Sequence, residues 1–410
     1  MARRKQTILN DPIYGFISIQ GGLILKLLDH PYFQRLGRIK QLGLTHLVYP
    51  GAYHTRLQHA LGVTHLMGTA IEVLRSKKHD ITKEEELAVT IAILLHDIGH
   101  GPFSHVLENT IVSNVTHEDL SDMFMGRLNE EFKGKLDLAI KIFANKYKKN
   151  FLHQLVASQL DMDRLDYLRR DSFFTGVAEG AISSDRIIKT LNIVDDNLVV
   201  DAKGIYSVEN FLIARRLMYW QVYLHKTVIA AEYLLIKILE RAKELGNQGA
   251  SLFATPALHY FLTRQPSKRD FAKDRRVLEM FAMLDDYDIL TSVKVWSQEG
   301  EPILKRLSAN LVNRNLFHIE LMDKPFSNSK IERIRAKTAK AYKISAEEAR
   351  YFVFTDVIGN SLYDSQSDKI NILYRDGKMV DIAVASDQLN ISVLSKRVEK
   401  HFLCCPKTMA

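Results

Sequence analysis

The densest group of reactive side chains follows an apolar run in the first quarter of the chain. Residues 92–95 are apolar, His96 and Asp97 come directly after them, and two more histidines stand at positions 100 and 105. Burying an imidazole beside a carboxylate without a partner is costly, and one divalent cation satisfies both groups. The same two ligand types suit Mn²⁺, Fe²⁺, Zn²⁺ and Mg²⁺. The segment therefore predicts a metal site at the end of a helix.

Two other segments can supply the remaining ligands. In the first, Arg56 and His59 are three residues apart and share a helix face. In the second, Asp163, Tyr167 and Asp171 fall at i, i+4 and i+8, which places them on one helical face. An ion bound by the His-Asp pair is expected to draw its other ligands from these two helices.

In chain order, His59, the pair His96-Asp97 and Asp163 resemble the H…HD…D pattern of the HD phosphohydrolases. A lone His-Asp pair arises by chance in many chains, whereas the ordered set with its neighbouring strings is distinctive. With those strings, the chain is similar to the deoxynucleoside triphosphate (dNTP) triphosphohydrolases, including the sterile-alpha-motif-and-HD-domain enzyme and its bacterial relatives. The strings occupy residues 33–36, 39–43, 49–52, 96–105 and 163–171, and the resemblance spans roughly residues 8–245.

The resemblance implies one divalent metal ion per active site (Mn, Fe, Zn, Ni or Mg), held by His59, His96, Asp97 and Asp163. Coordination positions left open would take water and a substrate oxygen. The ion would then activate the water and polarise the phosphoryl group.

Further residues complete the chemistry that the resemblance implies. His100 and His105 would face the phosphates, and His117 would be the general acid, oriented by Glu108. Protonation of a leaving alkoxide in this way contributes typically about 10²–10⁴-fold. Without the resemblance, His117 would be an ordinary histidine at the start of a helix.

Cations are needed to neutralise the phosphates, and the candidates are Arg56, Arg164, Arg215 and Lys226. Arg215, Tyr219, Tyr223 and Lys226 follow one another at spacings of four, four and three residues, which places them on one face of an expected long helix. The spacing alone fits equally well an amphipathic face whose charges reach solvent.

The resemblance also implies how a sugar would be held. Arg164, Arg215 and Tyr223 would contact the substrate, and Tyr167 would pack under the deoxyribose, where a 2′-hydroxyl would otherwise project. Gln41 and Asp171 would hydrogen-bond the 3′-hydroxyl, and Leu42 would lie near the sugar and base.

The chain departs from the regulated relatives at their second nucleotide site. That site uses a basic residue before the first hairpin and an arginine after the Phe-Gln-Arg string, and here Thr7 and Gly37 stand there. Asp29 and Gln34 are retained. Because each charge-assisted contact contributes on the order of 1.5–3 kcal/mol, activation by GTP of the same kind is not expected.

These residues must be positioned by a mainly α fold, an HD-domain helical bundle with short β-hairpins and a smaller C-terminal α+β region. Apolar periodicity predicts helices at 23–43, 56–76, 83–96, 117–132, 151–170 and 208–245, with hairpins within 7–20 and 193–206. Later segments predict strands at 312–321, 351–358, 370–374 and 378–384, and helices at 328–342 and 390–402. We expect an HD domain at 1–290, with its metal core at 56–171 and a substrate helix at 208–245, and a second region at 291–410.

Composition limits the surroundings in which this fold works. The only two cysteines, Cys404 and Cys405, are adjacent, so no disulfide framework is expected and the chain is interpreted as cytoplasmic. The most apolar stretch, 87–95, is about half the length of a membrane span, so no membrane association is predicted. The net charge of +8 suits a polyanionic ligand.

The leading hypothesis is hydrolysis of dNTPs to deoxynucleoside and triphosphate, by attack of metal-activated water on the α-phosphorus, in a homo-oligomer (dimer or tetramer, by resemblance). One alternative is an HD phosphohydrolase acting on a monophosphate, a cyclic nucleotide or an alarmone. Another is a nucleic-acid-binding or regulatory protein that keeps a structural metal site. A recognisable nucleic-acid motif is missing from the sequence, so nucleic acid is possible but not predicted.

Overall fold

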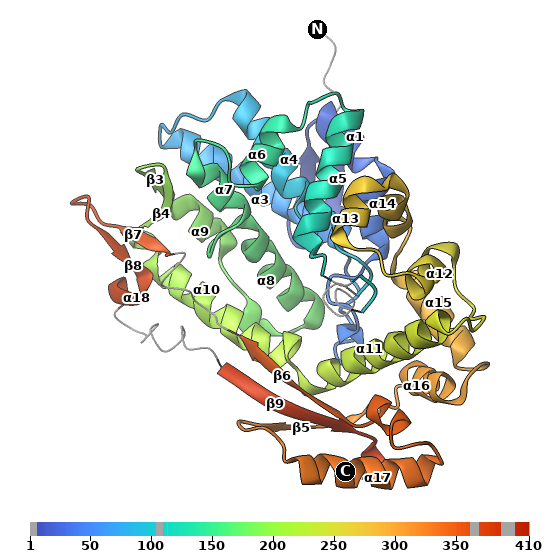
Figure 1. Ribbon diagram of the computed structural model, residues 1–410. Helices are drawn as coiled ribbons and strands as arrows, with labels where there is room; N and C mark the ends of the chain where they lie inside the picture. The colour runs from blue at the N-terminus through green and yellow to red at the C-terminus, as the bar shows by residue number, and fades with distance from the viewer. Residues whose placement is uncertain (1–5, 104–109, 113, 361–368, 387–397, 410) are drawn as a thin grey trace.

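The computed structural model describes residues 6–103, 110–112, 114–360, 369–386 and 398–409. Helices make up most of it, and the strands form three small sheets (Figure 1). The predicted mainly α class is confirmed. Among the described residues, no helix is long and apolar enough to cross a membrane.

Three helices form the centre of the bundle and carry the predicted metal ligands. α3 (Arg56–Ser76) packs against both α4 (Lys83–Leu95) and α8 (Met162–Thr175). Thr82 begins α4 by accepting a hydrogen bond from the Glu85 backbone N–H, and the Glu85 side chain accepts from the Thr82 N–H. The predictions for 56–76 and 83–96 are confirmed to within one residue.

The shorter helices surround this centre. α5 (His117–Glu131), predicted at 117–132, lies beside α6 (Asp137–Phe143), which packs in turn against α7 (Asn150–Val156). The remaining helices are α9 (Ser184–Thr190), α12 (Pro256–Thr263), α13 (Lys268–Lys273), α14 (Arg275–Ala282), α15 (Asp286–Trp296), α16 (Pro302–Val312), α17 (Asn328–Tyr342) and α18 (Ile382–Ala385).

Two of the predicted helices are broken, so their continuity was wrong. The segment 23–43 forms α1 (Leu23–Leu28), α2 (Pro31–Gln34) and a 3₁₀ turn at Arg35–Arg38, because Pro31 has no N–H to continue a helix and starts a new one. Within 151–170, α7 ends before Ala157, whose backbone is extended, and the Asp161 side chain caps α8.

The predicted long helix 208–245 is also interrupted. α10 (Ile205–Met218) passes into a π-helical turn at Tyr219–Tyr223 (η6), and α11 (Lys226–Asn247) begins anew after His225, whose backbone is extended and whose ring caps the Thr227 N–H. Lys226 therefore does not continue the helical face of Arg215, and the spacing argument for it was wrong. Such π turns inside helices are frequent at functional sites.

The two predicted hairpins are present. β1 (Thr7–Asp11) pairs with β2 (Gly15–Ile19), and β3 (Leu191–Val194) pairs with β4 (Asn197–Asp201). β4 also pairs in parallel with β7 (Asn371–Leu373), which pairs with β8 (Met379–Asp381). A late segment of the chain thus extends a sheet that begins in the bundle.

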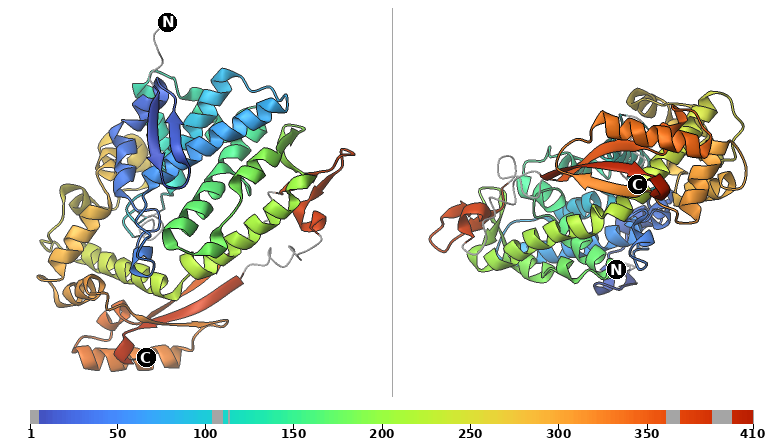
Figure 2. Two further views of the ribbon diagram at one scale, coloured as in Figure 1. Left: turned by 180° about the vertical axis from the view of Figure 1, so that it is seen from behind. Right: turned by 90° about the horizontal axis from the view of Figure 1, so that it is seen from below.

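The third sheet, which is antiparallel, lies at one end of the molecule with α17, on the far side of α11 (Figures 1 and 2). β9 (Val398–Cys405) is its central strand, between β5 (His318–Met322) and β6 (Phe354–Asn360). The helix predicted at 390–402 was wrong over 398–402, which lie in β9, and its first part lies outside the described residues. Residues 398–401 are half-buried or exposed with no strict alternation, and their strand conformation comes from pairing with β6, which periodicity along the chain does not reveal.

The boundary predicted at residue 290 falls inside α15. The division into an HD domain and a C-terminal region stays a prediction. Cys404 and Cys405 are both free thiols buried in β9.

Candidate active site

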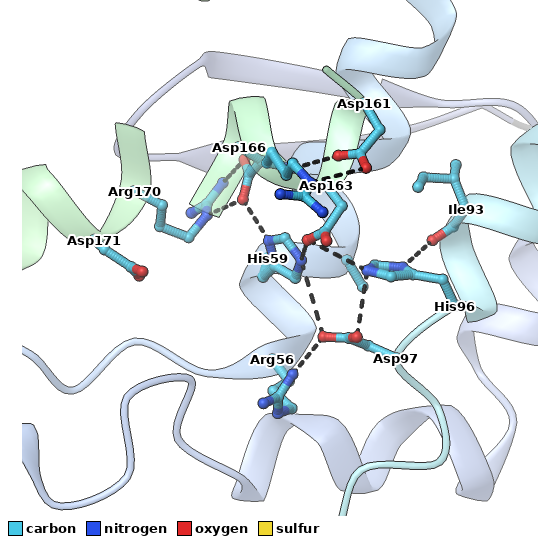
Figure 3. A network of polar contacts seen from close by, with 12 residues as sticks. Arg56, His59, Ile93, His96, Asp97, Asp161, Asp163, Asp166, Arg170 and Asp171 are labelled. Atoms are coloured by element: carbon cyan, nitrogen blue, oxygen red, sulfur yellow. Dashed lines mark hydrogen bonds and ion pairs between the residues drawn. The ribbon is translucent and has the colours of Figure 1, made fainter. Parts of the chain in front are cut away.

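Three of the four predicted metal ligands converge from separate elements. Ligand atoms of His59 on α3, His96 just after α4 and Asp163 on α8 all lie within 4.8 Å of one another. The Asp163 Oδ1 is 3.0 Å from His59 Nε2 and 3.6 Å from His96 Nε2 (Figure 3). Residues far apart in the sequence therefore present two imidazoles and a carboxylate to one point.

In both histidines, His59 and His96, the other ring nitrogen (Nδ1) contacts a second protein group. His59 Nδ1 lies 2.7 Å from Asp166 Oδ2, and His96 Nδ1 lies 2.6 Å from the Ile93 carbonyl oxygen (Figure 3). Both Nε2 atoms are buried and have no hydrogen bond of good geometry, although Asp163 is near. Metal-binding histidines are oriented in this way, by a hydrogen bond from the other ring nitrogen. The donor set and its orientation fit a divalent cation.

The electrostatics of this cluster favour a bound cation. Burial opposes charge on His59, but the neighbouring carboxylates of Asp163 and Asp166 raise its pKa to about 10. Burial likewise opposes ionisation of Asp163, and the two imidazoles nevertheless hold the pKa of its carboxyl below the ordinary value. The carboxylates thus attract positive charge, and a metal ion and a proton would compete for the same imidazole.

Asp97, the fourth predicted ligand, lies at the edge of this group. Its Oδ1 is 3.3 Å from His96 Nε2, and its Oδ2 is 3.9 Å from His59 Nε2. Arg56 donates a hydrogen bond to the same Oδ2, so the arginine lies against the predicted ligand rather than away from it (Figure 3). Burial raises the pKa of a carboxyl group, but His96 and Arg56 hold that of Asp97 well below its usual range.

Behind His59, a buried ion-pair chain leads to the N-terminal hairpin. Arg170 donates to Asp166 from Nε at 2.9 Å and to Asp11 from Nη1 at 2.8 Å. A Cβ added at Gly62 on α3 would lie 2.0 Å from Asp166 Oδ1, so only glycine allows α8 to approach this closely. The sequence analysis missed these residues, although Asp166 and Arg170 are spaced i, i+4 on a helix.

His117, the predicted general acid, lies on the Asp97 side of the metal cluster, next to His100. The ring of His117, the first residue of α5, stacks on that of His100 with centroids 4.0 Å apart, and His100 Nε2 is 3.3 Å from Asp97 Oδ1. Burial and the nearby Arg56 hold the pKa of His100 well below its usual value, which favours a neutral ring. His105 and Glu108 lie outside the described residues, so their roles stay predictions.

Glycine also determines how α5 meets this loop. A Cβ at Gly99 would lie 2.1 Å from the His117 carbonyl oxygen. Ser121 links the two segments by accepting from the Gly99 N–H and donating to the His96 carbonyl oxygen. The start of α5 is therefore held directly against the His-Asp segment.

Aromatic and cationic side chains predicted to bind substrate gather where α8 faces α10 and the π turn. The ring centroids of Tyr167 and Tyr223 are 6.3 Å apart, and those of Tyr219 and Tyr223 are 5.1 Å apart. The Arg215 guanidinium lies 5.9 Å from the Tyr219 ring centroid. Arg164 ion-pairs with Asp161 at 3.4 Å and is close enough to Tyr167 for their charges to interact.

The predicted sugar-binding residues lie on the same side. Both carboxylate oxygens of Asp171 are engaged, one by His54 and one by Tyr223, each at 2.7 Å. The Gln41 backbone N–H donates to the His54 carbonyl oxygen, and Leu42 packs half-buried against the core. The sequence analysis gave His54 no role, although it named Arg56 and His59 in the same segment. Lys226, at the start of α11, is exposed.

The positions that correspond to the second nucleotide site of the regulated relatives lie in and near the first hairpin and α2. Thr7 pairs with Ile19 in the first hairpin, and the Gln34 amide donates to the Leu28 carbonyl oxygen at 2.8 Å. Gly37 lies under Leu57, whose Cδ1 would be 3.5 Å from an added Cβ. The lack of a GTP-type activator site stays a prediction.

Comparisons with known proteins agree with this site. The HD domain model matches residues 56–171, and the HD associated region model matches residues 182–255. The uncharacterized protein YwfO of Bacillus subtilis is 31% identical, with 99% of this chain and 93% of that protein covered. The deoxynucleoside triphosphate triphosphohydrolase SAMHD1 homolog of Dictyostelium discoideum is 27% identical, with 86% of this chain and 76% of that protein covered.

Solved structures show the same architecture. A phosphohydrolase of Bacteroides thetaiotaomicron superposes with a TM-score of 0.95 at 55% identity, covering 98% of this chain and 100% of that one. A hypothetical protein of Aquifex aeolicus superposes with a TM-score of 0.72 at 27% identity, covering 99% and 98%. Together with the HD domain match and the convergent His-His-Asp group, these likenesses establish that the chain belongs to the HD-domain phosphohydrolases.

Proposed function

We propose that the protein hydrolyses dNTPs to a deoxynucleoside and triphosphate. The observation that carries the proposal is the layout of α8, which bears Asp163 at the metal cluster and, two turns later, Asp171 beside Tyr223. A metal site and a hydroxyl-binding carboxylate are thus joined by one rigid element. The separation suits a substrate with a phosphate at one end and a sugar at the other.

The metal end would be held by His59, His96, Asp97 and Asp163. A divalent ion bound there supplies Lewis-acid activation of water and of the phosphoryl group. Arg56, which already contacts Asp97, is placed to neutralise phosphate charge near the α-phosphorus. These roles rest on the donor set and on the orientation of both Nε2 atoms.

His117 would deliver the proton that the leaving 5′-oxygen requires. It stacks on His100, which contacts the Asp97 carboxylate, so it lies one ring away from the predicted ligands. His100 and His105 would face the phosphates, and Glu108 would orient His117. Arg164, Arg215 and Lys226 would supply the remaining positive charge.

The sugar end favours a deoxynucleotide. Burial raises the pKa of the Tyr167 phenol, so the side chain stays neutral. The Tyr167 ring would pack under the sugar and fill the space that a 2′-hydroxyl needs. Tyr219 and Tyr223 would border the sugar, Leu42 would lie near the sugar and base, and Gln41 and Asp171 would hydrogen-bond the 3′-hydroxyl. Two of the relatives described by name, in Dictyostelium discoideum and Homo sapiens, are deoxynucleoside triphosphate triphosphohydrolases.

The test is product chromatography with metal-loaded protein and each dNTP, alone and in mixture, with and without GTP. Intact triphosphate and a deoxynucleoside are the expected products. Release of pyrophosphate or orthophosphate, or turnover only of monophosphates, cyclic nucleotides or alarmones, would contradict the proposal. Elemental analysis identifies the metal, and sedimentation velocity tests the proposed homo-oligomer.

The variant that tests the metal end is Asp163→Asn, which keeps the shape of the side chain and removes its charge. This variant should lose turnover on every dNTP. Asp185→Asn, at an exposed carboxylate 3.7 Å from Arg169, should behave as wild type. If Asp163→Asn hydrolysed dNTPs as fast as the wild type, the metal would have no role in the mechanism.

A further inference from the structure

Asp171 is held on both sides by buried neighbours. His54 Nε2 lies 2.7 Å from Oδ1, and the Tyr223 hydroxyl donates to Oδ2 at 2.7 Å. Both His54 and Asp171 are only 2% exposed. Because a carboxylate can only accept, His54 carries the hydrogen on Nε2 in this contact. An ionised carboxylate offers about four lone-pair positions, so these two bonds leave capacity for a substrate hydroxyl.

His54 itself has little freedom. Its ring stacks on Phe174, one turn beyond Asp171, with centroids 4.5 Å apart and planes at 17°. The loop that carries it is pressed against the same residue, since a Cβ added at Gly51 would lie 2.4 Å from the Phe174 carbonyl oxygen. The imidazole is thus fixed against the end of α8 before any ligand arrives.

The backbone of His54 holds a second group. Its carbonyl oxygen accepts the Gln41 N–H at 2.9 Å, and the bridge between Lys40 and Thr55 continues this pairing. The Gln41 Oε1 is a buried atom with no hydrogen-bond partner among the described residues. One residue therefore joins the loop of Gln41 to the carboxylate of Asp171, although the two lie on segments far apart in the chain.

We infer that His54 is a positioning residue for recognition of the nucleotide sugar. The His54 side chain orients the Asp171 carboxylate, and the His54 main chain orients Gln41. Both groups would then contact the same hydroxyl, the 3′-hydroxyl of the substrate. The inference rests on the proposed function and deepens it, because it explains how the site tests for a free 3′-hydroxyl. A purely structural role for the His54–Asp171 pair would affect all nucleotides equally.

The experiment compares kcat and KM for a dNTP and for its 2′,3′-dideoxy analogue in two variants. His54→Phe keeps the ring stacked on Phe174 and removes the donor to Asp171. His54→Gln restores a donor at the position of Nε2. His79→Phe is the matched control, since His79 contacts Asn192 at the distant β3–β4 hairpin. Thermal unfolding establishes that each variant is folded.

We expect kcat/KM of His54→Phe for the dNTP to fall about tenfold or more, mainly through KM, since an aimed hydrogen bond to a charged group is lost. The dideoxy analogue, which lacks the hydroxyl, should change by less than about twofold. His54→Gln should recover most of the loss, and His79→Phe should match wild type.

Two other results have distinct meanings. Equal losses on the two nucleotides in His54→Phe, with the wild type active, would overturn the inference and leave the proposed function standing. Absence of dNTP turnover in the wild type would overturn both.

Discussion

The Nδ1 of His59 lies 2.7 Å from Oδ2 of Asp166, and this contact turns the Nε2 of the same ring toward Asp163. The carboxylate also accepts two hydrogen bonds from Arg170. A negative charge behind the ring makes the imidazole a stronger metal ligand and fixes its tautomer. We therefore expect Asp166 and Arg170, which lie behind His59, to affect metal affinity as strongly as the ligands themselves.

Asp166→Asn tests this relationship. The amide fills the same space but removes the charge behind His59, so metal affinity should fall by about 10–100-fold. Isothermal titration with Mn²⁺ measures the change, with Asp185→Asn as the surface control. Unchanged affinity in Asp166→Asn would show that the contact is structural only. The variant should also be less stable, because Arg170 loses one of its two buried charge partners.

Two glycines on α3 form a matched pair. Gly62→Ala places a Cβ 2.0 Å from Asp166 Oδ1 and 2.3 Å from Arg170 Nη2, whereas an added Cβ at Gly68 meets nothing within 4 Å. Gly62→Ala should therefore destabilise the protein by about 1–3 kcal/mol and weaken metal binding. Gly68→Ala should stabilise it by up to about 1 kcal/mol, since alanine favours the helix. Chemical denaturation measures both, and equal effects would contradict the packing.

His117→Ala separates proton transfer from metal binding. The variant should keep its metal and lose about 10²–10⁴-fold in kcat, as expected for a general acid. Asp97→Ala should lose metal and turnover together. Elemental analysis and single-turnover kinetics on the same preparations distinguish the two. Normal turnover in His117→Ala would refute the assigned role.

Glu232 on α11 gives a pH-dependent prediction away from the metal cluster. Burial raises the pKa of its carboxyl to about 8. The native state then binds more protons than the unfolded state between the ordinary pKa of about 4.3 and 8, so the free energy of unfolding falls as pH rises through this window. Glu232→Gln should be close to wild type near pH 4 and more stable by about 1–3 kcal/mol at pH 9. Denaturation curves at both pH values measure this.

The control for that experiment is Glu72→Gln, at an exposed position on α3. Its stability relative to wild type should not depend on pH. The same difference in Glu72→Gln and Glu232→Gln would show that net charge, rather than burial, is responsible.

The amino-acid sequence by itself predicted most of the central helices and a set of candidate metal ligands, three of which the structure brings together. α3 begins and ends where the periodicity predicts, because its start is set by the adjacent capping box of Thr55 and Gln58. His59, His96 and Asp163 were predictable since each follows a helix pattern and carries ligand chemistry, and the structure brings them together.

Only the tertiary structure shows the long-range contacts behind the site residues and the places where the predicted helices are interrupted. The contact of His54 with Asp171 spans 117 positions and that of Arg170 with Asp11 spans 159, and spacing along the chain carries no information about such pairs. The π turn at Tyr219–Tyr223 and the extended backbone of His225 interrupt the helix, which the spacing of residues along the chain does not reveal, so Arg215 and Lys226 do not share one continuous helical face. The first residues of β9 were predicted as part of a helix, because residues 398–401 show no regular alternation of burial and their strand conformation comes from pairing with β6, which local periodicity does not reveal.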